Sequence, residues 1–438
     1  MSAADSVADV VVVGGGPAGS TAAALLAERG HRTVLIEKAR HPRFHIGESL
    51  LPANLPLFRR LGLAQAVHAV GMQKWGVEFH SPVHGRSQSY RFADSWNKEM
   101  PHAYEVRRSE LDEILIRRAG TLGATVIEGC RARDVEFLGD EGVRVHTEHE
   151  GGARQSWRAR FLIDASGRDT FLGARLGTKR RNPRHNSASI YAHFSNAWRH
   201  EDPRRAGDIS IFWFEHGWFW YIPLADGVTS VGVVAWPYYM KRRTRPVREF
   251  FLETIALCPA LAARLNAAQL ASEVEATGNY SYDCTHPCGQ SYLLAGDAYA
   301  FIDPVFSSGV LFAMQAGAAA AEALDLALRE PERRAAALRR FARVSRQGPK
   351  AFSWFIYRMT RPAMQELFMD PHNPLRMREA LLSLLAGDIY GGTPIWNALR
   401  AFKMLYYLLS ALTPRRSLAA RRRALNLRSL GTDAAAAG

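Results

Sequence analysis

The chain has 438 residues and a formal net charge of +14, with 47% hydrophobic and 22% charged residues. These values are ordinary for globular proteins and exclude a disordered or collagen-like chain, and the length predicts two or three domains. The excess charge is concentrated near the end of the chain. Residues 329–438 hold 20 Lys and Arg against 7 Asp and Glu, whereas residues 1–328 hold 36 against 35.

Several classes of protein are disfavoured by simple counts. Four cysteines are too few for a disulfide framework in a chain of this length. The start has no basic stretch followed by an apolar one, so we expect no signal peptide. The longest apolar runs reach about ten residues, well short of the roughly 20 that span a bilayer. We therefore expect a cytoplasmic protein, and the spacing of Cys284, His286 and Cys288 predicts no metal site.

The first part of the chain predicts an α/β framework. A β-branched run at 9–13, an Ala- and Leu-rich stretch at 20–29 and an apolar run at 33–37 are typical of strand, helix and parallel strand. A helix is expected at 109–122. Strands are expected between 126 and 145 and at 161–164.

The second part predicts inserted β-structure and then helices. Residues 187–235 alternate in strand fashion, most clearly at 209–214 and 229–235. A short strand is expected at 292–295 and an Ala-rich helix at 309–328. From there the pattern is helical, and helix breaks are expected at each of six prolines: Pro331, Pro349, Pro362, Pro371, Pro374 and Pro394.

A glycine-rich turn follows the first strand. Gly14, Gly16 and Gly19 form a G-x-G-x-x-G pattern that opens the helix, where a tight turn, a close backbone approach and the helix N-terminus suit a pyrophosphate. Glu37 ends the next strand, 18 residues after Gly19, where a carboxylate can bind ribose hydroxyls. The pattern therefore predicts dinucleotide binding.

A second set of residues favours FAD over NAD. Gly296-Asp297-Ala298 follows the strand expected at 292–295, and an acid followed there by a second helix N-terminus suits the ribityl and pyrophosphate groups of FAD. With Arg108 and Asp164, these motifs resemble the FAD-dependent monooxygenase superfamily over residues 9 to 328. No second G-x-G-x-x-G follows a strand, so we expect reduced flavin to come from a separate reductase.

Two further segments resemble the flavin-dependent halogenases. Residues 47–52 read G-E-S-L-L-P, and residues 218–223 read W-F-W-Y-I-P, a W-x-W-x-I-P string. The resemblance implies that FADH2 and O2 form a flavin hydroperoxide, which oxidises chloride or bromide to hypohalous acid. Trp218, Trp220 and Pro223 would form a wall that keeps the aromatic substrate away from the flavin. An ordinary packed aromatic strand is the simpler alternative for the tryptophans.

The same resemblance implies the reacting groups. It places the essential lysine at Lys74, whose ammonium can polarise hypohalous acid or whose neutral amine can form a haloamine; burial favours the second route. A solvated lysine beside a turn is the alternative. The amides of Ser308 and Gly309, at the start of the Ala-rich helix, would bind halide.

Position 306 departs from the pattern of the tryptophan halogenases. These enzymes are expected to carry a glutamate there, and this chain has Phe306. The resemblance is therefore to the phenol- and pyrrole-type branch, which includes enzymes that act on acyl groups tethered to a carrier protein. We expect a free or carrier-bound phenol or pyrrole as substrate, in the biosynthesis of an antibiotic or pigment.

The basic last quarter suits docking of an acidic carrier protein. Its arginines gather at 333–346 and at 415–423. A solvated helix face and a peripheral membrane contact through 398–412 are the alternatives. No basic groove with interleaved aromatic residues is visible, so nucleic acid is not expected.

Taken together, the sequence predicts a Rossmann-like FAD-binding domain of the monooxygenase type over 1–330. A β-sheet substrate domain would interleave with it at about 75–105 and 175–285, and 331–438 would form a helical extension. A flavin-dependent aromatic hydroxylase or dehydrogenase is the alternative enzyme, and a flavin-binding partner protein with a vestigial site is a third hypothesis. The residues expected to bind FAD are Gly14, Gly16, Gly19, Glu37, Lys38, Arg43, Glu48, Ser49, Arg108, Asp164, Gly296 and Asp297; those expected in the wall are Trp218, Trp220, Pro223 and Phe306.

Overall fold

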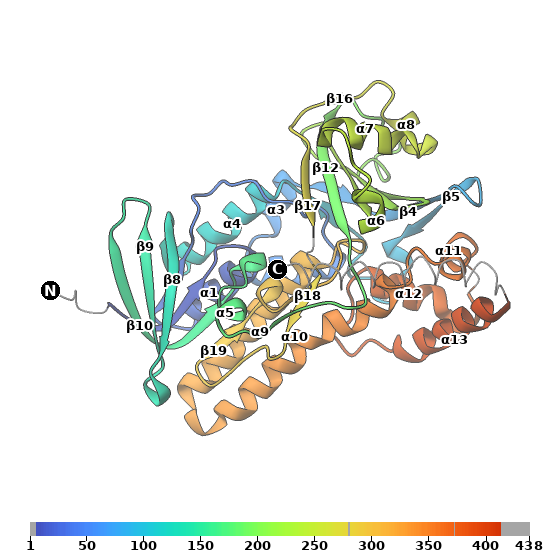
Figure 1. The fold of residues 1–438 in the computed structure, drawn as a ribbon. Coiled ribbons are helices and arrows are strands. Elements are labelled where there is room, and N and C mark those ends of the chain that lie inside the picture. Colours follow the sequence, from blue (N-terminus) through green and yellow to red (C-terminus); the bar gives the residue numbers. More distant parts are fainter. Residues whose placement is uncertain (1–5, 279–280, 372, 413–438) are drawn as a thin grey trace.

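The computed structural model describes residues 6–412 except 279–280 and 372. Its fold is α/β, as the sequence predicts, and is built on two large sheets. Figure 1 shows the first sheet at the end of the molecule that carries the N-terminus, and the second sheet at the other end beneath helices α7 and α8.

The first sheet contains the glycine-rich turn. Its strand order is β7-β2-β1-β10-β9-β8, with β19 paired to β10. Strands β7, β2, β1, β10 and β19 are parallel neighbours, whereas β9 pairs antiparallel with β10 and β8. The bounds are β1 Ser6–Val13, β2 Thr33–Ile36, β7 Thr125–Ile127, β8 Cys130–Phe137, β9 Val143–His149, β10 Arg154–Asp164 and β19 Tyr292–Leu294.

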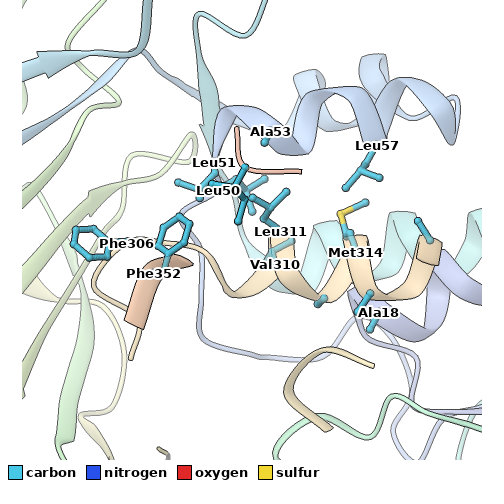
Figure 2. Packing of buried hydrophobic residues seen from close by; sticks show 14 of the residues in the cluster. Ala18, Leu50, Leu51, Ala53, Leu57, Phe306, Val310, Leu311, Met314 and Phe352 are labelled. Carbon is cyan, nitrogen blue, oxygen red and sulfur yellow. The ribbon is translucent and has the colours of Figure 1, made fainter. Parts of the chain in front are cut away.

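Three helices pack beside this sheet: α1 (Pro17–Glu28), α4 (Arg108–Thr121) and α9 (Gly309–Arg329). Small residues bring α1 and α9 together, since a Cβ on Gly317 would lie 2.3 Å from the carbonyl oxygen of Ala18. Figure 2 shows Val310, Leu311 and Met314 of α9 among other buried apolar side chains. Helix α9 is long and apolar enough to cross a membrane, but 67% of its apolar window is buried, as in a core helix.

The second sheet runs in the order β16-β12-β15-β14-β13-β4-β5, with β17 paired to β12. Its strands pair antiparallel except for β13 with β4. Its bounds are β4 Gly76–Ser81, β5 Arg86–Arg91, β12 Ala188–Ser195, β13 Ile209–Phe214, β14 Gly217–Pro223, β15 Thr229–Ala235, β16 Gln269–Leu270 and β17 Glu275–Gly278. One face packs against α6 (Pro237–Met240), α7 (Val247–Ala256) and α8 (Pro259–Arg264).

Shorter elements join the two sheets. Strands β3 (Met72–Lys74) and β6 (Ala103–Glu105) form a separate antiparallel pair. The other short elements are α2 Leu55–Arg60, α3 Ala64–Val70, α5 Phe171–Arg175, β11 Lys179–Arg181, β18 Tyr282–Cys284 and β20 Ala300–Phe301.

The last described part of the chain is helical. Helix α10 (Arg334–Ile356) packs along α9, and α11 (Pro362–Met369), α12 (Met377–Leu385) and α13 (Trp396–Leu412) follow beside the second sheet (Figure 1). The predicted break at Pro349 is wrong because α10 continues through it. Phe341 and Phe352 on either side of Pro349 are fully buried, so packing against the core outweighs the lost backbone hydrogen bond.

Candidate active site

The glycine-rich turn is close-packed. Gly14 has φ +107°, and a Cβ there would lie 2.3 Å from the carbonyl oxygen of Ala165. A Cβ on Gly19 would lie 1.9 Å from the carbonyl oxygen of Gly14. At Gly16, by contrast, the nearest atom is 3.8 Å away, on Arg43. Gly14 and Gly19 therefore permit the close packing, and Gly16 leaves open space beside the backbone.

That open space belongs to a large cavity of about 870 Å³. Its volume falls within the roughly 300–1,000 Å³ typical of ligand and cofactor pockets. The cavity runs from the glycine-rich turn to the second sheet. The predicted residues that line it are Gly14, Gly16, Glu37, Lys38, Arg43, Glu48, Ser49, Arg108, Asp297, Gly309, Trp218 and Trp220. Those that do not line it are Gly19, Lys74, Asp164, Gly296, Ser308, Pro223 and Phe306.

The carboxylate of Glu37 lies at the glycine-rich turn. Its two oxygens accept hydrogen bonds from the backbone amides of Gly15 (2.6 Å) and Ala39 (2.9 Å). Lys38, beside it, forms an ion pair with Asp169. The strand end thus presents a fixed carboxylate and a half-exposed lysine at the cavity.

Two arginines converge on the buried carboxylate of Asp112. Arg108 donates two hydrogen bonds to it, at 2.8 and 2.9 Å, and the guanidinium of Arg43 lies 3.4 Å away. Burial works to raise the pKa of Asp112, but Arg108 and Arg43 outweigh it and hold the pKa below its usual range. Asp112 thereby fixes two cations that line the cavity.

Two expected acidic residues occupy different surroundings. Asp297 lines the cavity, and burial raises its pKa to about 6. Asp164 instead accepts hydrogen bonds from the backbone amides of Ser166 and Leu172, so it shapes the loop behind the cavity.

The helix N-terminus predicted directly after Asp297 is wrong. Residues Gly296–Ala298 form a single 3-10 turn, and the strand β20 follows it. Gly296 has φ +61°, and a Cβ there would lie 3.1 Å from the Cα of Ala313 in α9. The turn thus packs closely against α9, and the chain continues into a strand instead of a helix.

The loop before α9 brings Ser307 and the first residue of the helix, Gly309, to the cavity. Ser307 has φ +56°, and Ser308 occupies the N-cap position of α9 without a capping hydrogen bond from its side chain. Ser307 and Gly309 line the cavity, while the side chain of Ser308 is buried. Free backbone amides and the helix dipole make such a position suitable for an anion.

The W-x-W-x-I-P string forms strand β14. Trp218, Trp220 and Ile222 point into the cavity, because alternate side chains of a strand share a face. Pro223 therefore lies on the opposite face, so its predicted place in the wall is wrong. Phe306 does not line this cavity and its ring packs on Phe352 of α10 at a centroid distance of 6.0 Å (Figure 2), so its place in the wall stays a prediction.

Lys74 is the last residue of β3 and is 1% exposed. Its Nζ donates hydrogen bonds to Oγ of Ser49 and to the carbonyl oxygen of Leu50, both at 2.7 Å. Burial lowers the pKa of Lys74, and the nearby carboxylate of Glu105 opposes that shift. Ser49 lines the cavity, so its hydroxyl lies between Lys74 and the cavity.

Comparison with known proteins gives a consistent result. Residues 7–345 match the family model described as FAD binding domain. The chain is 32% identical over 406 residues to the 1H-pyrrole-2-carbonyl-[peptidyl-carrier protein] chlorinase of Pseudomonas fluorescens, covering 88% of this chain and 90% of that protein. It belongs to the flavin-dependent halogenases.

Solved structures agree with this assignment. The myxobacterial chondrochloren halogenase CndH is 31% identical, with a TM-score of 0.78 over 92% of this chain and 96% of that one. The flavin-dependent brominase Bmp2 is 26% identical, with a TM-score of 0.80 over 91% of this chain and 99% of that one. The expected enzyme class, cofactor and halide substrate are therefore confirmed, and the hydroxylase or dehydrogenase alternative is not favoured.

The cavity of this halogenase suits FAD on its own features. The turn at Gly16 has room for a pyrophosphate, and Arg43 and Arg108 supply positive charge. Glu48 is buried in the cavity wall, where Oε1 contacts His193 at 2.8 Å and Oε2 has no hydrogen-bond partner among the described residues. An unpartnered buried oxygen at a cavity is a place for a polar group of a ligand.

Sequence reasoning missed two functional candidates in this halogenase. Glu105 is fully buried 3.6 Å from Lys74, and His193 pairs with Glu48. Neither residue belongs to a motif. The one signal for Glu105 was a carboxylate placed three residues before Arg108 in an otherwise apolar strand.

Proposed function

We propose that this halogenase acts on an electron-rich aromatic acyl group, a phenol or a pyrrole, carried on an acidic carrier protein, with Lys74 as the catalytic group. The observation that carries the proposal is the placement of Lys74. Its Nζ is hydrogen-bonded to Oγ of Ser49, which is hydrogen-bonded to Oγ of Ser307, two residues before Gly309. The named substrate of the Pseudomonas fluorescens relative, a pyrrole on a peptidyl carrier protein, supports the carrier-bound form.

Halide would bind at the start of α9. The amides of Ser308 and Gly309 are unpaired by helix geometry, and the helix dipole adds positive potential there. Reduced FAD, when bound, would supply the two electrons that activate O2, and the activated oxygen would oxidise halide to hypohalous acid. We expect a separate flavin reductase to deliver the reduced cofactor, and we expect both proteins in the cytoplasm.

Trp218 and Trp220 would separate the substrate from the flavin. Their rings lie 6.1 Å apart on the cavity face of β14, and the indole nitrogen of Trp220 donates to Oγ of Ser230 at 3.2 Å. Fixed indoles exclude an aromatic ring and leave room for a small oxidant. Phe306 contributes no carboxylate here, so the substrate itself must be rich in electrons.

Lys74 would act on the oxidant as it reaches the far side of this wall. As an ammonium it donates a hydrogen bond to the oxygen of hypohalous acid, which makes the halogen more electrophilic. As an amine it takes up the halogen, water leaves, and the halogen then passes to the ring. Burial lowers the pKa of Lys74, so the neutral amine forms more readily than it does in water.

The carrier protein would dock on the exposed arginines of α10. Arg339, Arg343 and Arg346 are exposed on this helix. Carrier proteins are acidic, and opposite charge accelerates encounter. The second arginine cluster, at 415–423, lies outside the described residues. Exposed apolar residues of α13 at 404, 407, 408 and 412 border the same helical region, so a membrane contact stays an alternative there.

The experiment supplies a flavin reductase, NADH, O2 and either chloride or bromide to the purified protein, with free and carrier-loaded phenols and pyrroles as substrates. We expect halogenated product, read from its mass and isotope pattern, with the carrier-loaded substrate preferred. Lys74→Ala should abolish product, and Lys241→Ala, which changes an exposed lysine directly after α6, should not. Full activity of Lys74→Ala would refute the assigned role, and hydroxylated product would refute the proposed reaction.

A further inference from the structure

The carboxylate of Glu105 is buried on the strand next to Lys74. Strands β3 and β6 form a two-stranded antiparallel sheet, in which Lys74 pairs with Ala103 and Glu105 pairs with Met72. Glu105 is 0% exposed, and its Oε1 lies 3.6 Å from Nζ of Lys74. Burying either charge without the other would carry a large desolvation cost, so the two groups stabilise each other.

The hydroxyl of Ser49 joins the two groups and has every hydrogen bond that it can form. It accepts from Nζ of Lys74 at 2.7 Å and from Oγ of Ser307 at 2.8 Å, and it donates to Oε1 of Glu105 at 3.2 Å. A serine hydroxyl has one proton and two lone pairs. The direction of these bonds is therefore fixed, and it leads from Lys74 through Ser49 to Glu105.

Other charged groups face this pair from two further segments. Asp208 lies before β13, accepts a hydrogen bond from the amide of Trp75 at 3.0 Å, and is itself paired with Arg91. The ring of Phe92 lies 5.6 Å from Nζ of Lys74. Asp208 is thus a second carboxylate near Lys74, and it is shared with Arg91.

Both groups of the pair are shifted toward their neutral forms. Burial raises the pKa of Glu105 to about 8, against the opposing effect of Lys74. Burial lowers the pKa of Lys74, against the opposing effects of Glu105 and Asp208. Oε2 of Glu105 has no partner among the described residues, so no existing hydrogen bond stabilises its ionised form there.

We propose that Glu105 is a positioning residue that accepts the proton of Lys74 through Ser49 and so leaves a neutral amine facing the oxidised halogen. This inference rests on the proposed role of Lys74. In the step, a proton passes from Nζ to Oγ of Ser49 while the proton of Ser49 passes to Oε1 of Glu105. An ammonium and a carboxylate become an amine and a carboxylic acid, so the buried site keeps its net charge of zero.

The first test is the pH dependence of kcat. Glu105→Gln removes both the proposed proton acceptor and the carboxylate that raises the pKa of Lys74. We therefore expect a lower kcat, with the acid limb of its pH profile moved to lower pH by at least one unit. KM for the aromatic substrate should not change. Ser49→Ala should lower kcat and leave the limb near its original pH, and Glu105→Asp, which keeps the charge, should keep the wild-type limb. A Glu105→Gln profile that superimposes on the wild type after scaling would overturn the proposal.

The second test does not depend on activity. A carboxyl group whose pKa is raised on folding makes stability fall as pH rises from its unfolded pKa, about 4.3, to its folded pKa. The thermal midpoint of Glu105→Gln, relative to the wild type, should therefore rise between about pH 5 and pH 8. Glu99→Gln, at an exposed position, is the control and should show no such trend. A difference in thermal midpoint between Glu105→Gln and the wild type that stays constant over this pH range would overturn the inference. An active Lys74→Ala enzyme would instead overturn the proposed function.

Discussion

Oγ of Ser307 donates a hydrogen bond to Oγ of Ser49 over 2.8 Å, joining two loops that are 258 residues apart in the chain. Ser307 precedes α9, where halide is expected, and Ser49 holds Nζ of Lys74. The contact therefore ties the proposed halide site to the proposed catalytic lysine. Because both hydroxyls line the cavity, this link also faces the space expected for the cofactor.

The glycine-rich turn should tolerate no side chain at its first position. Gly14→Ala places a Cβ 2.3 Å from a backbone oxygen at φ +107°, so either the turn or the strand β10 must move. We expect at least a tenfold loss of FAD affinity, measured by flavin fluorescence titration.

The matched control for that variant is Gly30→Ala. Gly30 also has positive φ, +86°, but no atom lies within 4 Å of its Cβ position. It should cost about 1–2 kcal/mol of stability from backbone strain alone and leave FAD affinity unchanged. Equal losses of affinity in the two variants would show that strain, rather than contact with Ala165, controls the turn.

The place of Trp220 depends on a glycine in the neighbouring strand. A Cβ on Gly232 would lie 2.2 Å from the indole of Trp220. Gly232→Ala should therefore push the indole out of place, lower stability by about 1–3 kcal/mol and reduce halogenation. Adding Trp220→Leu should restore stability in urea unfolding without restoring halogenation.

Gly278→Ala, on the strand β17, is the control for this overpacking. Its Cβ would make an ordinary contact of 3.4 Å with the side chain of Ala188. We expect stability and product yield close to the wild type. Wild-type stability and product yield in Gly232→Ala would show that the indole of Trp220 can move aside without loss of function, and would contradict this prediction.

Asp112 should contribute stability that disappears in acid. Its pKa is held below its usual range, so the contribution is complete above the unfolded pKa of about 3.9 and is lost as pH falls through the folded value. Asp112→Asn leaves Arg108 buried without its carboxylate and should cost about 3–5 kcal/mol at neutral pH. Urea unfolding at several pH values should show this deficit shrinking below about pH 4. A deficit independent of pH would contradict the assigned charge pairing.

Docking of a carrier protein predicts a selective effect of salt. Raising ionic strength should weaken turnover of a carrier-bound substrate far more than that of the free aromatic compound, because surface charges are screened over about 10 Å at 0.1 M salt. Reversing charge on α10, with Arg339→Glu and Arg343→Glu, should raise KM for the carrier-bound substrate alone. Arg154→Glu, on the highly exposed end of β10, is the control. Equal effects on both substrates would contradict docking of the carrier protein on these arginines and leave them a role in solubility.

The sequence predicted the parts of the site that depend on local pattern. The glycine-rich turn, Glu37 and the tryptophans of β14 are each set by neighbours within one strand and its following turn, so their motifs carry the geometry. Glu105 could not be found in this way. Its position beside Lys74 depends on the register of β3 against β6 and on the bridge between Ser49 and Glu105, which are long-range contacts. The errors at Pro349 and after Asp297 lie where the chain packs against distant segments. The error at Pro223 is different, because strand alternation alone puts it on the face opposite Trp218 and Trp220.

The most direct test separates formation of hypohalous acid from its use. Lys74→Ala is supplied with reduced flavin, O2, bromide and substrate in the presence of a small β-diketone that reacts with free hypohalous acid. Because Lys74 acts after the oxidant has formed, the account predicts halogenated diketone at close to the wild-type rate. The aromatic product should fall by at least about a hundredfold, the lower range for loss of an acid–base group. Undiminished halogenation of the aromatic substrate by Lys74→Ala would contradict the account.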